Sequence, residues 1–156
     1  HRSDYRVPLD EVVAAARLRA AGAAAAADVE LEAVAADRSE LLARTANLAA
    51  LVLANLLANA IEATPRGGRV KLTAGAHADR LEFFVSDTGP GIAEDQQKHV
   101  FDRFWQAKQA RDGGAGLGLA ISRTIVQAHG GELWATSEVG RGSTFLFTLP
   151  LSPSPG

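Results

Sequence analysis

The chain has 156 residues, 47% of them hydrophobic and 22% charged, which suits one globular domain and is too short for two of ordinary size. Its 16 Lys and Arg against 18 Asp and Glu give a net charge of -2, without the basic excess that a nucleic acid partner requires. The absence of Cys excludes disulfides, thiolate zinc sites and thiol catalysis, and it suits a reducing, cytoplasmic setting.

The N-terminal part of the chain predicts a helix and then a strand. Pro8 fits the first turn of a helix and Gly22 its end, so we expect a helix over residues 9–21. The alternation in "VELEAV" predicts a half-buried strand over residues 29–34. Residues 37–45 are ambiguous between strand and loop.

A second helix is expected over residues 47–63, where apolar side chains lie almost all round the helix, as they do when packing covers most of its surface. Its apolar run, residues 48–61, is interrupted by Asn55 and Asn59 and falls short of the roughly 20 residues needed to span a bilayer. We therefore predict a buried helix and no direct membrane contact.

Two alternating stretches, residues 69–76 and 80–87, predict a β-hairpin. Residues 89–116 then form a long loop around a short helical pattern, and a compact domain carries such a loop only for a use. A helix over residues 117–129 and a closing hairpin follow.

The predicted elements place five strands against helices that share one apolar face. This favours an α+β fold, a two-layer α/β sandwich with a five-stranded sheet on about three helices. No βαβ unit repeats, so a doubly wound parallel sheet is disfavoured. We expect one domain over residues 1–150 and a disordered tail over residues 151–156.

Three polar side chains share one side of the second helix. Asn55, Asn59 and Glu62 are spaced i, i+4, i+7. Each amide can simply bond to a neighbouring loop. Two amides and a carboxylate on one stripe of an apolar helix favour an oxygen-lined site, and oxygen ligands suit Mg²⁺.

The stretch "SDTGPGI" ends a predicted strand with Asp87 and then bends at Gly89 and Gly91. One interpretation is an ordinary turn, since Asp, Gly and Pro are common in turns. The other is a carboxylate at the floor of a pocket, with glycines that let a flat ligand lie close to the backbone.

Two glycine-rich stretches complete the set. "GGAGLGLAI" puts glycines before and inside the start of a helix, where free N–H groups bind anions, although it lacks the Walker ending and the preceding strand of a dinucleotide fingerprint. "GRGSTF" lies between the last two strands, and a hairpin turn alone explains it.

The ordered set of motifs carries a resemblance. Five stretches resemble the N, G1, F, G2 and G3 boxes of the catalytic ATP-binding domain of bacterial sensor histidine kinases: "NLLANA" (55–60), "DTGPGI" (87–92), "FDRF" (101–104), "GAGLGLAI" (114–121) and "GRGSTF" (140–145). The resemblance spans residues 7–150. It implies the Bergerat ATP-binding fold of the group that includes Hsp90, MutL and type II topoisomerases, with a mixed sheet, a mobile lid over about residues 94–114, and ATP and Mg²⁺ as cofactors.

The resemblance also implies roles for individual residues. Asn59 is expected to bind Mg²⁺, Asn55 to support the phosphates or the metal, and Asp87 to accept the exocyclic amine of adenine. The remaining expected nucleotide contacts are Glu62, Gly89, Gly91, Ile92, Gly114, Gly116, Leu117, Gly118 and Thr144, the last closing the adenine side. In the lid, Phe101 and Phe104 are expected to anchor the segment and Arg103 to meet phosphate charge, with Lys108 or Arg111 as further cations.

Two departures from the family pattern matter. Glu62 stands where many of these kinases have a basic residue, so the phosphate cation is expected from the lid, or Glu62 adds to the Mg²⁺ shell through water. None of the four histidines fits the phosphoacceptor pattern. The acceptor is therefore expected on separate dimerisation helices, with a response regulator as an indirect partner and this fragment as a monomer.

Two alternatives stay open. One is a hydrolytic relative like Hsp90 or MutL, although these have a Glu one turn before the metal Asn, where this chain has Asn55. The other is a degenerate module that keeps the fold for protein contacts and no longer uses ATP.

Overall fold

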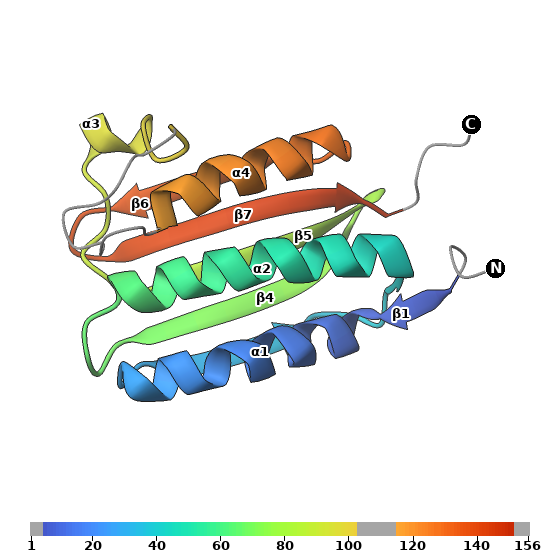
Figure 1. The fold of residues 1–156 in the computed structure, drawn as a ribbon, viewed down its shortest axis with the longest axis horizontal. Coiled ribbons are helices and arrows are strands. Elements are labelled where there is room, and N and C mark those ends of the chain that lie inside the picture. The colour runs from blue at the N-terminus through green and yellow to red at the C-terminus, as the bar shows by residue number, and fades with distance from the viewer. Residues whose placement is uncertain (1–4, 103–114, 152–156) are drawn as a thin grey trace.

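A mixed five-stranded sheet covered on one face by three long helices forms the domain (Figure 1). The computed structural model describes residues 5–102 and 115–151. Across the sheet the strands are β2 (Glu30–Ala35), β4 (Arg69–His77), β5 (Arg80–Asp87), β7 (Gly142–Pro150) and β6 (Leu133–Glu138). Among these five strands, β2 and β4 form the one parallel pair. Parallel neighbours need a long connection, and the chain between β2 and β4 provides one. The predicted fold class is confirmed.

The first helix is longer than the sequence predicts. Helix α1 (Leu9–Ala26) runs through Gly22, whose backbone has no positive φ and which has nothing within 4 Å of the place where a Cβ would stand. The alanines that follow are strong helix formers and continue it. The chain leaves the helix only at Asp28, where φ is +57°.

The ambiguous segment contains a strand and the start of the central helix. Strand β3 (Glu40–Leu42) pairs antiparallel with β1 (Arg6–Pro8) in a small second sheet. Helix α2 (Ala43–Ala63) begins directly after it, four residues earlier than predicted.

Helix α2 is the core helix of the domain. By length and composition it could cross a membrane, but it lies between α1 and α4 (Ala115–Ala128) over the sheet (Figure 1). Val52, Leu53 and Leu56 are completely buried there. Asn55 and Asn59, which interrupt the apolar run of this helix, are half-buried.

The two faces of the sheet differ in a regular way. Side chains alternate along a strand, and Phe83 and Phe147 stack beneath the helices with ring centroids 4.6 Å apart. On the same face of β7 lies Phe145, which is also buried. The even-numbered residues of β5 and β7 therefore face away from the helices. Whether a residue of these strands has an odd or an even number thus decides whether it can lie on the helix side of the sheet.

The predicted site elements gather at one end of the molecule. The C-terminal end of α2, the end of β5, the start of β7, the start of α4 and the short helix α3 (Glu94–Gln97) all lie at the left in Figure 1. At the C-terminus, the N–H of Leu151 donates to the carbonyl of Asp79 at 2.9 Å. Leu151, which falls in the predicted tail, packs against the core.

Candidate functional site

Asp87 is a buried carboxylate at the end of β5, with only 8% of its surface exposed. Its Oδ1 accepts a hydrogen bond from the N–H of Gly89 at 2.9 Å and another from the N–H of Ser143 at 3.3 Å. Burial raises the pKa of the Asp87 carboxyl above its ordinary value, and the two N–H donors oppose that rise. A buried carboxylate that the backbone holds in place is suited to accept a hydrogen bond from a ligand.

The glycines after Asp87 let the chain pass close to the backbone of neighbouring elements. A Cβ on Gly89 would lie 2.7 Å from the carbonyl oxygen of Ala63, at the end of α2. Gly91 has a φ of +79°, and a Cβ there would overlap the carbonyl of Glu138. The G1 loop is thus pressed between α2 and the β6–β7 hairpin, and larger residues would push these elements apart.

Ser137 on β6 joins the G1 loop to the closing hairpin. Its Oγ accepts from the N–H of Ile92 at 2.6 Å and donates to the carbonyl of Gly142 at 3.1 Å. The side chain of Gln97 on α3 donates to the carbonyls of Ile92 and Ser137, at 2.9 and 3.0 Å. Ile92 is therefore held in place by two side chains that sequence reasoning did not single out.

Thr144 lines the same hollow as Asp87, but its hydroxyl does not face that carboxylate. Its hydroxyl lies 2.9 Å from that of Ser86, its partner on β5, and both face away from the helices. Ser143 lies on the inner face instead, in phase with Phe145, and is 7% exposed. The inward-facing neighbour of Asp87 on β7 is therefore Ser143 and not Thr144, because strand parity puts neighbouring residues on opposite faces.

Of the two predicted site amides on α2, Asn55 faces α4. The Asn55 side chain donates from Nδ2 to Oγ of Ser122 at 3.0 Å. A Cβ on Gly118 would lie 3.8 Å from Cγ of Asn55, so this glycine lets the amide lie close to the helix. Asn59 follows one turn later on the same side of α2, whereas Glu62 is exposed.

The glycine-rich stretch provides the first turn of α4. The described part of α4 begins at Ala115, so Gly116, Leu117 and Gly118 lie in its first turn. The predictions for Arg103, Phe104, Lys108, Arg111 and Gly114 lie outside the described residues.

Phe101 packs where the lid segment leaves α3. Its ring meets that of Phe145 edge-on, with centroids 6.2 Å apart, and the guanidinium of Arg123 on α4 lies 4.8 Å from its centroid. The neighbouring Val100 is completely buried. The chain just after α3 is thus fixed to both β7 and α4 through Phe101, the residue that the resemblance expects to anchor a lid.

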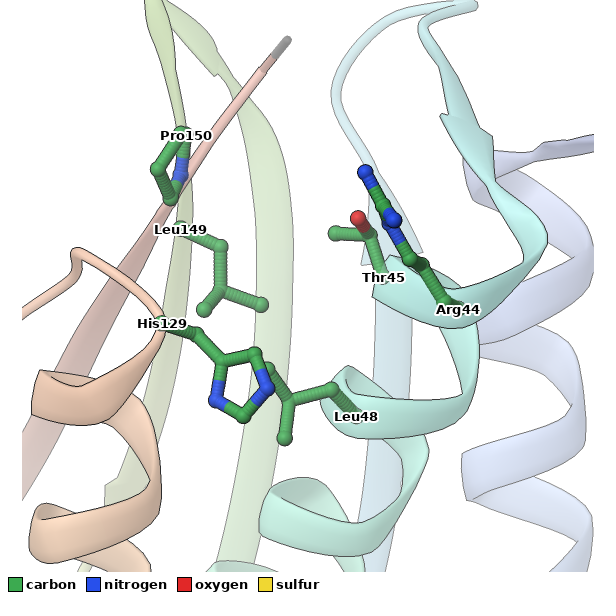
Figure 2. Close-up of a pocket in the computed structure, with 6 residues that line it drawn as sticks. All are labelled: Arg44, Thr45, Leu48, His129, Leu149 and Pro150. Carbon is green, nitrogen blue, oxygen red and sulfur yellow. The ribbon is translucent and has the colours of Figure 1, made fainter. Parts of the chain in front are cut away.

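A different hollow, of about 260 Å³, opens at the opposite end of the helical layer (Figure 2). Figure 2 shows Arg44 and Thr45 at the start of α2 across from His129 at the end of α4. The ring Nδ1 of His129 lies 2.9 Å from the carbonyl oxygen of Ile125 and caps the end of α4. None of the predicted site residues lines this hollow.

Comparison with known proteins identifies the family. A family model described as "Histidine kinase-, DNA gyrase B-, and HSP90-like ATPase" matches residues 45–153, more than half of the chain. The sensor histidine kinase RppB of Synechocystis sp. is 45% identical over 107 residues, covering 67% of this chain and 24% of that protein. The sensor-like histidine kinase SenX3 of Mycobacterium tuberculosis is 38% identical over 147 residues, covering 92% of this chain and 36% of that protein.

Solved structures of histidine kinases are also similar to this chain. The nucleotide-free catalytic domain of the histidine kinase ThkA matches with a TM-score of 0.80 at 27% identity, with 96% of each chain covered. ThkA in complex with the response regulator protein TrrA matches with a TM-score of 0.75 at 27% identity, over 96% of this chain and 42% of that one.

The chain therefore belongs to the histidine kinase-, DNA gyrase B- and HSP90-like ATPase family, and its fold is that of the catalytic ATP-binding domain of sensor histidine kinases. Nucleotide use follows from this membership. The chain spans 17% to 36% of the length of the curated relatives it matches.

Proposed function

We propose that this chain binds Mg·ATP and delivers the γ-phosphoryl group to a histidine on dimerisation helices that lie outside it. The observation that carries the proposal is the buried carboxylate of Asp87. Both hydrogen bonds that the described residues make to it end on Oδ1, so Oδ2 remains as an acceptor for the exocyclic amine of adenine. Burial strengthens such a bond because little water competes for it.

The facing ends of α2 and α4 fit the phosphates and a magnesium ion. Asn59 offers an amide oxygen as a metal ligand, and Asn55 supports the phosphates or the metal from one turn earlier. The N–H groups of Gly116, Leu117 and Gly118 are donors for phosphate oxygens. Mg²⁺, which commonly shares its coordination between protein oxygens, phosphates and water, offsets phosphate charge when bound.

The remaining contacts complete the site. Ser143 closes the adenine side next to Asp87, and Gly89, Gly91 and Ile92 shape the pocket. Arg103 of the expected lid supplies the positive charge for the phosphates, because this chain has Glu62 where many of these kinases have a basic residue. With the phosphates held and their charge offset, the protein has little covalent chemistry to perform.

The choice of kinase over hydrolase depends on Asn55. Hydrolytic members of the wider group are similar in having a Glu at this position, where it activates water. An amide cannot act as a general base, and here its nitrogen donates to Ser122. The nucleophile is therefore an imidazole nitrogen from outside the chain, which forms the N–P bond as the bond to the leaving ADP breaks.

The partners follow from the same proposal. The acceptor helices belong to the parent protein, and the phosphoryl group passes from them to a response regulator. The crystal structure of ThkA with TrrA supports a partner of that class. The domain works in the cytoplasm, where ATP and response regulators are found.

The test is to mix this chain with labelled ATP, Mg²⁺ and a panel of dimerisation helices, and to look for phosphate that is labile in acid and stable in base. Asn59→Ala is expected to abolish the transfer. Asn47→Ala is the matched control, because Asn47 is an exposed amide near the other end of the same helix. Absence of labelled helices in every mixture, or robust ATP hydrolysis that Asn55→Ala abolishes, would contradict the kinase assignment.

A further inference from the structure

Ser122 is a buried polar residue in the middle of α4, and its surface is 0% exposed. Serine is a weaker helix former than alanine, and a buried hydroxyl must be hydrogen-bonded, so the position has a cost that packing alone does not explain. Its contact across the helix pair is the Asn55 amide, whose Nδ2 donates to Oγ at 3.0 Å. Asn55 and Ser122 are 67 residues apart in the sequence, and the bond between them joins α2 to α4.

The geometry fixes the orientation of the amide. Gly118 and Ser122 are four residues apart and so share one face of α4; this face meets α2, since Ser122 bonds to Asn55 and a Cβ on Gly118 would lie against the same amide. With its nitrogen on Ser122, the Asn55 amide has its oxygen on the other side of Cγ, and a Cβ on Gly118 would lie 3.8 Å from Cγ and 3.9 Å from Oδ1. Gly118 is one turn closer to the start of α4, which is the end expected to hold the phosphates.

A serine hydroxyl inside a helix can donate to the carbonyl four residues earlier. When its proton is used in this way the hydroxyl can only accept, and only the amide nitrogen can then face it. Without the hydroxyl, the Asn55 amide can rotate by half a turn and present its NH₂ group to the phosphate end.

We propose that Ser122 is a positioning residue: it holds the Asn55 amide so that the oxygen, and not the nitrogen, faces the magnesium triphosphate. The inference rests on the proposed function of Asn55. It assigns a role in nucleotide binding to a residue that never touches the nucleotide.

The test compares Ser122→Ala with the unmodified chain in the affinity for a fluorescent ATP analogue, measured with and without Mg²⁺. We expect the gain in affinity on adding Mg²⁺ to fall about three- to tenfold, the range for one hydrogen bond, while the metal-free affinity does not fall. Thr124→Ala is the matched control, because Thr124 is exposed on the same helix and its hydroxyl donates to the carbonyl of Ala120.

A double-mutant cycle separates positioning from a structural role. In an Asn55→Ala background, Ser122→Ala is expected to change neither affinity, because the group it orients is gone. An unchanged Mg²⁺-dependent gain in Ser122→Ala, or an equal loss in both backgrounds, overturns the inference while leaving the proposed function intact. Failure of the unmodified chain to bind Mg·ATP overturns the proposed function and this inference together.

Discussion

Replacing Asp87 by Asn tests the adenine contact with the smallest possible change. The amide oxygen can still accept from the N–H groups of Gly89 and Ser143, which both bond to Oδ1 in the structure. The other oxygen becomes an NH₂ donor and faces the donor amine of adenine. The local fold is therefore preserved, whereas the proposed contact is replaced by two opposed donors.

The size of the effect follows from the kind of bond that is lost. A hydrogen bond to a charged group contributes about 1.5–3 kcal/mol, so Asp87→Asn is expected to weaken nucleotide binding by about 10- to 150-fold. The assay is titration of a fluorescent ATP analogue in the presence of Mg²⁺. Circular dichroism checks that the variant is folded.

The control is Asp10→Asn, which makes the same chemical change at an exposed position in the first turn of α1. We expect this variant to bind as the unmodified chain does. If Asp87→Asn is folded and binds within twofold of the control, the carboxylate does not hold adenine, and the degenerate-module alternative gains support.

Three further predictions concern stability. Because burial raises the pKa of Asp87, the folded state holds its proton more tightly than the unfolded state does, so ionisation lowers the unfolding free energy as the pH rises from 3.8 through the folded pKa. In urea unfolding, Asp87→Asn should therefore gain stability relative to the unmodified chain across that pH range. A difference in unfolding free energy that stays constant with pH would contradict this. Gly142→Ala is expected to cost about 2–4 kcal/mol of unfolding free energy, because Gly142 has a φ of +114° and a Cβ there would overlap the carbonyl of Asp87. Gly22→Ala is the control and should be stabilising, because there is open space around Gly22. Arg123→Gln is expected to lower the unfolding free energy by about 0.5–1 kcal/mol through loss of the cation–π contact with Phe101, and an unchanged midpoint of thermal unfolding would show that the ring is held by Phe145 alone.

Local signals in the sequence were sufficient for the long elements. The period of the apolar residues gave the three helices and the strands of the main sheet. The end of α1 was misplaced because a glycine signals a helix end only where the chain turns left-handed, and Gly22 does not. Strands β1 and β3 have three residues each and pair with one another, so no local period could reveal them.

The site was predictable as far as the motifs reached. Asp87, Gly89 and Gly91 occupy the strand end and tight bends that their motif indicated. That Ser143 and not Thr144 faces inward could have been found from sequence, because Phe145 and the alternate residues after it are apolar and mark the inner face. Ser122 could not be found in this way, since only the packing of α4 on α2 shows what its hydroxyl meets.

The register of β7 also restricts how the closing hairpin can change. Inserting or deleting one residue in the turn between β6 and β7 would shift the strand by one position, and a slip of one residue exchanges the two faces. Thr144 would then turn inward beside Asp87, and Phe145 would leave the core for solvent. Natural or engineered variation in the length of this turn should therefore occur in steps of two residues, or be accompanied by a bulge that restores the phase.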